Sequence, residues 1–82
     1  MPIKVTLSDK ANKEIQRLGL GKQFEKQKRL FISNPDHPSL DFKPLKGVIK
    51  GLYAFRINRQ YRARLVKLDE QTYHILVVGD FH

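Results

Sequence analysis

The sequence predicts a small α+β domain in which a two-helix hairpin packs on one face of an antiparallel meander sheet, in the order β-α-α-β-β-β-β. Three observations predict this fold. The chain has 82 residues, the size of one domain. Two segments in its first half have the apolar spacing of helices. Three segments in its second half have the alternation of strands and are joined by hairpin-length turns. We therefore expect residues 1–82 to form a single domain.

The first element is predicted to be a strand over residues 2–7, where apolar and polar residues alternate. An amphipathic helix over residues 9–18 follows, because Ser8 is a favourable N-cap and apolar residues then recur at helical spacing. The residues that carry these patterns are Ile3, Val5 and Leu7 in the strand and Ala11, Ile15 and Leu18 in the helix.

Two glycines, Gly19 and Gly21, are expected to end this helix. A second helix is predicted over residues 21–33, up to the helix-stopping Pro35. Its buried face is expected to contain Phe24, Gln27 and Phe31.

An ordered loop over residues 34–44 and a short strand over residues 45–48 are predicted next. Three longer strands follow, and their short connections predict an antiparallel meander. The last strand is apolar on both faces, which is typical of a central strand. The three predicted strands cover residues 51–58, 60–68 and 72–81.

Strand alternation predicts which side chains face the helices and which lie on the open face of the sheet. The inward set is Tyr53, Phe55, Ile57, Tyr61, Ala63, Leu65, Tyr73, Ile75, Val77 and Phe81. The outward set is Arg56, Arg62, Arg64, His74, Leu76, Val78, Asp80 and His82. Lys43 and Lys46 are expected to approach the same open face from the preceding loop.

Charge is unevenly distributed along the chain, whose formal net charge is +8. Residues 42–67 contain eight Lys and Arg residues and no Asp or Glu. Concentrated positive charge indicates a polyanionic partner such as RNA, DNA or an acidic protein. The alternative is a solvated basic face that only aids solubility, but solubility does not require charge of a single sign.

The composition excludes several classes of protein. The chain has no cysteine, which excludes a disulfide scaffold, a thiolate metal site and a cysteine nucleophile and is consistent with the cytoplasm. Its apolar runs are too short to span a bilayer, and its first ten residues lack an apolar signal segment. No carboxylate cluster favours a divalent metal. No cofactor of any other kind is expected either.

The predicted arginine-rich face has a chemical meaning. Guanidinium groups bind phosphate through paired hydrogen bonds, and converging cations stabilise the extra charge of a pentacovalent phosphorane. A histidine can transfer a proton near neutral pH. His82 lies on the predicted arginine-rich face and could be such a proton-transfer residue. It could equally be a frayed end of the chain. His37 is interpreted as a turn residue and His74 as a half-exposed strand residue.

The sequence resembles the RelE/ParE superfamily of toxins from bacterial toxin–antitoxin pairs, and the RelE/YoeB-like branch in particular. The resemblance covers nearly the whole chain. Its most specific part runs through HPSLDFKPLKG (37–47), GLYAFRIN (51–58), QYRARLV (60–66) and HILVVGDFH (74–82). The predicted order of elements also agrees with the RelE-like microbial ribonuclease fold of that superfamily.

The resemblance implies a ribosome-dependent mRNA endoribonuclease that cuts the codon in the ribosomal A site without a metal or other cofactor. It implies that Arg62 contacts the scissile phosphate, that Arg56 is a second basic site residue, and that His82 transfers a proton. RNA-binding roles are expected for Lys43, Lys46, Arg59 and Arg64. The implied partners are mRNA on the ribosome and a cognate antitoxin, with no membrane.

Two alternatives remain open at this stage. The ParE branch uses the same fold to inhibit DNA gyrase, and Ala54 stands here where related ribonucleases often carry a lysine. The chain could also be a catalytically inactive homologue that binds RNA. The endoribonuclease cleaves mRNA, whereas a gyrase inhibitor and an inactive RNA-binding homologue do not.

Overall fold

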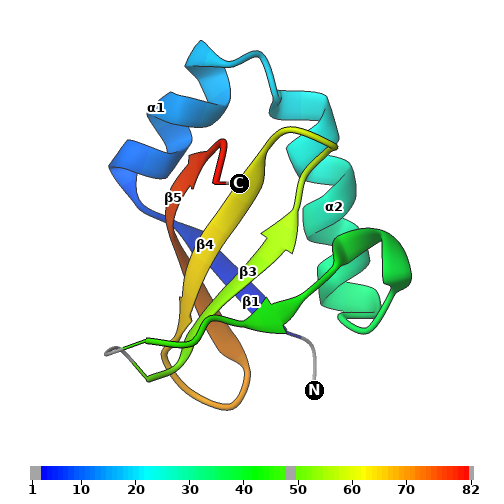
Figure 1. Ribbon diagram of the computed structural model, residues 1–82, viewed down its shortest axis with the longest axis vertical. Coiled ribbons are helices and arrows are strands. Elements are labelled where there is room, and N and C mark those ends of the chain that lie inside the picture. The colour runs from blue at the N-terminus through cyan, green and yellow to red at the C-terminus, as the bar shows by residue number, and fades with distance from the viewer. Residues whose placement is uncertain (1–2, 48–49, 82) are drawn as a thin grey trace.

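A computed structural model describes residues 3–47 and 50–81 and has the predicted order of elements (Figure 1). Two helices and a 3-10 turn accompany a five-stranded sheet. The elements are β1 (Lys4–Leu7), α1 (Asp9–Arg17), α2 (Gly21–Ser33), η1 (Pro38–Leu40), β2 (Lys43–Pro44), β3 (Leu52–Arg56), β4 (Arg62–Lys67) and β5 (Thr72–Gly79). The predicted α+β class is therefore confirmed. No helix in the described part of the chain is both long and apolar enough to cross a bilayer.

The sheet has the strand order β1-β5-β4-β3-β2 and is mixed rather than wholly antiparallel. Strands β2 to β5 form the predicted antiparallel meander. Strand β1, however, lies parallel to β5, with Val5 beside Tyr73 and Leu7 beside Ile75. This pairing makes β5 an interior strand, as its apolar faces predict, and brings the first strand next to the last.

Both helices cover one face of the sheet, as predicted (Figure 1). Gly19 has a φ of 69°, a left-handed conformation that glycine adopts without strain, and it separates α1 from α2. Gly21 is the first residue of α2 rather than part of the break. The predicted face of α2 is buried, and its Phe31 stacks on Phe55 of β3 with ring centroids 5.3 Å apart. The core contains residues of both helices and of the inward face of the sheet.

The short second strand lies two residues earlier than predicted. Strand β2 consists of Lys43 and Pro44 and pairs with Ala54 and Tyr53 at the edge of the sheet. An edge strand tolerates proline because one side of its backbone needs no partner in the sheet. Leu45 continues the pairing through its amide, which donates to the Leu52 carbonyl at 2.8 Å. Val48, the last residue of the predicted strand, lies outside the described residues.

Strand alternation correctly predicts the faces of β3 and β4 but fails in the second half of β5. Leu65 pairs with Ile75, whereas Arg64 pairs with Val77, so Leu76 is an extra residue in a β-bulge. Beyond the bulge every side chain changes face. Val78 is fully buried, although it was predicted to face outward, and Val77 pairs with Arg64 on the open face.

The same shift moves Phe81, which was predicted to face inward, to the open face. Its ring lies beneath the Arg64 guanidinium, 4.1 Å from the ring centroid. The shift also removes the alternation argument that placed Asp80 on that face. A single inserted residue, which alternation of polarity does not reveal in the all-apolar segment 75–78, accounts for these errors.

Ser8 connects the start of α1 to the bulge. Its hydroxyl oxygen accepts a hydrogen bond from the Ala11 amide at 3.0 Å, as the predicted N-cap should. The same hydroxyl donates to the carbonyl of Leu76 at 2.7 Å, and the Ser8 amide donates to the Ile75 carbonyl at 2.9 Å. One side chain therefore caps a helix and also bonds to the backbone of the bulge residue Leu76.

We predict that Ser8→Ala lowers the free energy of unfolding by about 1–2 kcal/mol, because it removes the cap and the bulge contact together. Urea denaturation measures the difference. Ser33→Ala is the matched control, since this exposed hydroxyl donates to the Leu30 carbonyl of its own helix, and it should cost less than about 0.5 kcal/mol. Equal losses from the two variants would contradict the role assigned to Ser8.

Candidate nucleic-acid interface

Three cations of the predicted site meet on the open face of the sheet, near the end where β3 finishes and β4 begins. Arg56 and Arg62 are directly opposite each other across these two strands. Lys43 is on the neighbouring edge strand, opposite Ala54. We refer to Lys43, Arg56 and Arg62 as the cationic cluster. Like charges in directly opposed positions destabilise a sheet unless an anion lies between them.

That anion is the carboxylate of Asp41. Its Oδ2 atom lies 2.9 Å from Nη1 of Arg62, 3.6 Å from Nζ of Lys43 and 3.8 Å from Nη2 of Arg56. The contact with the Arg62 guanidinium holds the pKa of Asp41 below its usual range, and the charges of Lys43 and Arg56 act in the same direction. Asp41 is therefore a carboxylate at neutral pH and offsets part of the repulsion within the cluster.

The backbone fixes Asp41 in this position. It follows η1, and its amide donates to the Pro38 carbonyl at 3.2 Å. Its φ of 47° is in the left-handed region, which aspartate tolerates better than most residues. On either side, Leu40 is fully buried and Phe42 stacks on Tyr53 with ring centroids 5.1 Å apart. The two anchored neighbours leave the carboxylate little freedom to move away from the cluster.

A buried glutamine connects α2 to the two segments that carry Arg56 and Asp41. The Nε2 group of Gln27 donates to the Arg56 carbonyl at 2.8 Å and to the Ser39 carbonyl at 3.3 Å. The end of β3 and the loop before Asp41 are thus held to the same side chain. This explains why a polar residue belongs on the buried face of α2, where it would otherwise be costly.

A pocket of about 250 Å³ opens beside the cluster. Its walls combine cations with an apolar surface, and its lining residues are Lys43, Leu45, Ala54, Arg62, Arg64 and Phe81. Arg64 lies over the Phe81 ring, in the arrangement of a cation–π contact. Cations beside an aromatic surface are the combination with which proteins bind phosphate and stack nucleobases.

Arg62 is the most enclosed cation of the cluster, with 21% of its side chain exposed. Its Nη1 atom is buried and close to Asp41, but no acceptor lies in line with its N–H groups. The 2.9 Å contact with Asp41 is an ion pair, and its charge attraction does not depend on alignment. A buried donor without an aligned acceptor can still bind an anionic oxygen.

The other predicted site residues are more dispersed. Arg59 lies in the β3–β4 loop and lines a separate hollow, which it shares with Arg56 and Lys26. Lys46 is exposed just after β2, and Asp80 follows β5. The predicted proton-transfer residue His82 lies outside the described residues. The structure thus brings together Lys43, Arg56 and Arg62, with Arg64 beside them, and leaves the remaining assignments as predictions.

Two described histidines have structural roles consistent with their interpretation. The Nδ1 atom of His37 accepts from the Ser39 amide at 3.1 Å and so caps η1, as expected of a turn residue. The Nδ1 atom of His74 lies 2.7 Å from the Thr6 hydroxyl and joins β5 to β1. Within the described ranges, no group of three His, Asp or Glu residues could hold a metal ion.

Sequence reasoning missed two residues of this site. Asp41 immediately precedes residues 42–67, a stretch without Asp or Glu. As the acidic residue next to this basic stretch, it could have been recognised as a counter-ion. Phe81 was assigned to the core because the bulge at Leu76 leaves no mark in the polarity pattern.

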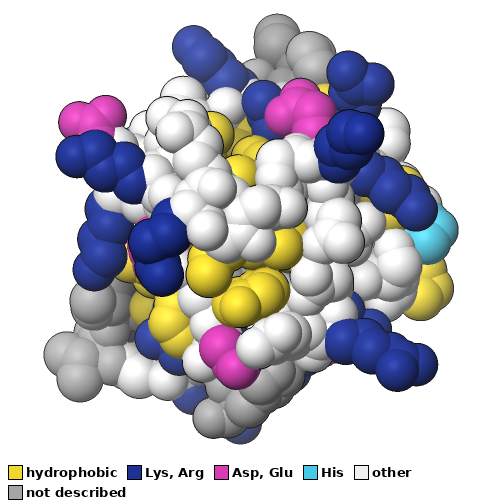
Figure 2. All heavy atoms as spheres, turned by 90° about the horizontal axis from the view of Figure 1, so that it is seen from above, with side chains coloured by type: hydrophobic (Ala, Val, Ile, Leu, Met, Phe, Trp, Pro, Cys, Tyr) yellow, Lys and Arg dark blue, Asp and Glu magenta, His cyan; other side chains and the backbone are white. Residues whose placement is uncertain are grey.

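Figure 2, which views the end of the molecule seen at the top of Figure 1, shows many Lys and Arg side chains around the outline and few acidic ones.

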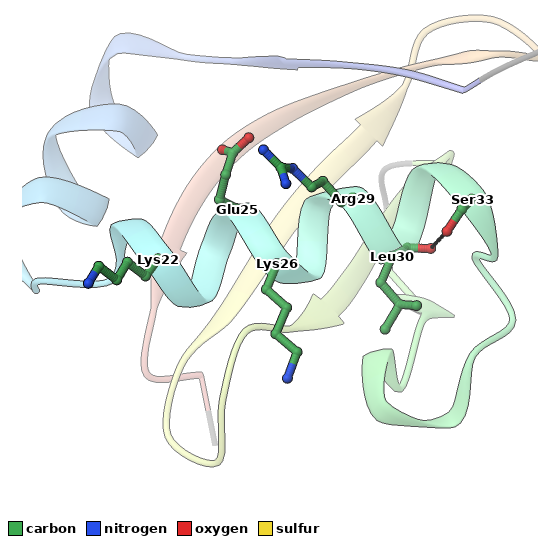
Figure 3. Close-up of a pocket in the computed structure, with 6 residues that line it drawn as sticks. All are labelled: Lys22, Glu25, Lys26, Arg29, Leu30 and Ser33. Carbon is green, nitrogen blue, oxygen red and sulfur yellow. Dashed lines mark hydrogen bonds between the residues drawn. The ribbon is translucent and has the colours of Figure 1, made fainter.

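A larger hollow of about 520 Å³ lies elsewhere, on the exposed side of α2 (Figure 3). Its lining residues are Lys22, Glu25, Lys26, Arg29, Leu30 and Ser33. In Figure 3, Glu25 and Arg29 extend to one side of the helix while Lys26 and Leu30 extend to the other. None of the predicted site residues lines this hollow, so the pocket beside the cationic cluster is the better candidate site.

Comparisons with solved structures give consistent matches to toxins. The chain is similar to a YoeB/ParE toxin from Agrobacterium tumefaciens, with a TM-score of 0.74, 16% identity and coverage of 98% of this chain and 100% of the other. It is similar to a YoeB dimer from Staphylococcus aureus, with a TM-score of 0.74, 19% identity and coverage of 98% and 97%. It is also similar to a chain of the Escherichia coli DinJ–YafQ toxin–antitoxin complex, with a TM-score of 0.76, 15% identity and coverage of 98% and 93%.

No protein-family model matches the sequence, and no curated protein matches it. At identities of 15–19% the structural matches establish the fold. The chain therefore has the fold shared by YoeB, ParE and YafQ toxins, over nearly its whole length. The resemblance drawn from the sequence is confirmed at the level of the fold.

We predict that Asp41→Asn lowers the free energy of unfolding at pH 7 by at most about 1 kcal/mol, because a third of this carboxylate is exposed and solvent screens the ion pairs. Asparagine also tolerates the left-handed backbone, so the change mainly removes charge. The pKa of Asp41 is lower in the folded than in the unfolded state, so its stabilisation is present above the unfolded value near 4.

The difference between wild type and Asp41→Asn should therefore shrink as the pH falls through the folded-state pKa, and urea denaturation from pH 7 to pH 3 measures it. Asp36→Asn, which changes an exposed carboxylate in the turn after α2, is the control and should show no such trend. A difference that persists unchanged to low pH would exclude the ion pairs as its cause.

Proposed function

We propose that this protein is the toxin of a toxin–antitoxin system and that it inhibits translation as a ribosome-dependent, metal-free mRNA endoribonuclease. One observation carries the proposal: Lys43, Arg56 and Arg62 converge beside a pocket on the open face of a fold shared with YoeB and YafQ toxins. A group of cations that surrounds a single oxygen suits the phosphate of a nucleic acid.

The proposed reaction cleaves RNA by internal attack. The 2′-oxygen of a ribose forms a bond to the adjacent phosphorus and loses its proton to solvent water, and the bond from phosphorus to the 5′-oxygen breaks. The products are a 2′,3′-cyclic phosphate and a 5′-hydroxyl end. In this proposal Arg62 and Arg56 bind the non-bridging oxygens and stabilise the additional negative charge of the phosphorane.

His82 is proposed to donate the proton that the leaving 5′-oxygen requires, a role suited to a group that titrates near neutral pH. Lys43, Lys46, Arg59 and Arg64 are proposed to bind neighbouring phosphates. Lys43 lies opposite Ala54, where related toxins often carry a lysine, so an ammonium group is still supplied beside this position. The reaction needs no cofactor.

A second candidate is inhibition of DNA gyrase, because one of the matched structures is described as a YoeB/ParE toxin. The two candidates share a fold but differ in their target, and mRNA cleavage separates them. A homologue without catalytic activity would bind RNA in a salt-dependent manner and leave it intact.

A cognate antitoxin is the proposed protein partner. YafQ was solved in complex with DinJ, and YoeB from Staphylococcus aureus in a heterotetramer with YefM. A small domain with a net charge of +8 would gain stability from an acidic partner that covers its cationic surface. We propose that the complex resides in the cytoplasm, where mRNA and ribosomes are available.

We predict that Arg62→Ala reduces mRNA cleavage by at least a hundredfold, because it removes the most enclosed phosphate ligand of the proposed site. Mapping of mRNA 5′ ends in a translating extract measures cleavage, and thermal unfolding checks that the variant is folded. Lys67→Ala is the matched control from the same strand: this lysine is exposed and pairs with Tyr73, away from the cluster, so cleavage should be unchanged.

Intact mRNA at inhibitory doses of the wild-type protein would overturn the nuclease proposal. Trapped gyrase–DNA cleavage complexes under the same conditions would then identify the second candidate. Cleavage by Arg62→Ala at the wild-type rate would exclude the proposed role of this arginine.

We also predict that expression together with the product of the adjacent gene increases the yield of soluble protein several-fold, because binding to the native state adds to its stability. Comparison of soluble yields and co-purification of the two chains measures the effect. Equal yields without co-purification would contradict the proposed antitoxin.

A further inference from the structure

We propose that Asp41 is a built-in counter-ion of the cationic cluster, which occupies the anion site in the free protein and competes with the phosphate of the ligand. This inference deepens the proposed function, on which the choice of RNA as the ligand rests. It assigns to Asp41 a role in setting the affinity of the site, apart from any step of the cleavage reaction.

The geometry of the contacts carries the inference. All three cations contact the same atom, Oδ2, at 2.9 Å for Arg62, 3.6 Å for Lys43 and 3.8 Å for Arg56. A single anionic oxygen surrounded by two guanidinium groups and an ammonium is the arrangement expected of a bound phosphate oxygen. The carboxylate therefore stands where an oxygen of the ligand would be held.

The position of Asp41 is imposed by the fold rather than by the ion pairs alone. Among the described residues, Asp41 is the one non-glycine residue with a positive φ. Leu40 and Phe42 anchor the backbone on both sides, and Gln27 holds the preceding Ser39 carbonyl. A carboxylate held in this way remains close to the cluster when a phosphate approaches, and it repels that phosphate.

The burial of the cluster adds a second consequence. The Nη1 atom of Arg62 is buried and has no aligned acceptor, so Asp41 neutralises its charge without satisfying its hydrogen-bonding capacity. A phosphate with several oxygens can align with guanidinium N–H groups that a single carboxylate oxygen leaves unaligned. The counter-ion stabilises the free cluster, and a phosphate that bonds better with the guanidinium groups can still bind beside it.

If Asp41 is a counter-ion, its removal changes the affinity for anions in the direction opposite to that expected from structural damage. Removing the negative charge should strengthen anion binding, and a unit charge about 4 Å from the ligand in water corresponds to about a fivefold change in affinity. A substitution that merely disorders the site would weaken binding instead.

The experiment measures the affinity of two probes for the purified full-length chain at low salt. The first is a single-stranded RNA with 2′-O-methyl groups, which lacks the attacking hydroxyl and is not cleaved. The second is inorganic tripolyphosphate. Asp41→Asn and Asp41→Gly both suit the left-handed backbone. Glu70→Gln, in the turn at the far end of β4, makes the same change in net charge and is the control.

We expect both Asp41 variants to bind both probes about fivefold more tightly than wild type, and Glu70→Gln to differ from wild type by less than twofold. Binding by the Asp41 variants that is unchanged, weaker, or no tighter than that of Glu70→Gln overturns the inference. If tripolyphosphate binding tightens but no variant binds RNA, the proposed function fails while the counter-ion role stands. Failure of every variant to bind either probe overturns both.

Discussion

The one-residue bulge in β5 determines which side chains meet the helices and which form the open face. Strand pairing alternates side chains strictly, so an extra residue at Leu76 reverses every position after it. The reversal buries Val78 in the core and places the Phe81 ring under Arg64. The bulge is supported by Ser8, whose hydroxyl satisfies the Leu76 carbonyl while it caps α1. The start of the first helix and the composition of the candidate site therefore depend on the same short segment.

Much of this architecture follows from local patterns in the sequence. The two helices, the three-strand meander and the buried face of α2 all correspond to apolar spacing that one segment contains by itself. The parallel pairing of β1 with β5 does not, because it depends on residues far apart along the chain. The bulge also leaves no trace, since Ile75, Leu76, Val77 and Val78 are all apolar and either alternation fits them.

Only part of the candidate site could be predicted, because local patterns reveal residues in regular strands but not residues in loops. Arg56, Arg62 and Arg64 alternate within regular strands, and the structure places them on the predicted open face. Asp41 lies in a loop, where no periodicity indicates the direction of a side chain, and its left-handed backbone turns it towards the cluster. The sheet tolerates two arginines in opposed positions because a carboxylate from a neighbouring loop supplies a compensating negative charge.

The pairing of the first strand with the last also affects how the protein can fold during its synthesis. The contact between Thr6 and His74 joins positions 68 residues apart, and β5 fills the space between β1 and β4. Until residues 72–79 have left the ribosome, β1 has no neighbour in the sheet and β4 lacks one of its two partners. Such high contact order delays folding, because the entropy of closing the long loop is lost before the contacts form. A nascent chain of this protein therefore emerges with its cationic residues on an unfolded segment, and the site is assembled only after β5 has been added to the sheet.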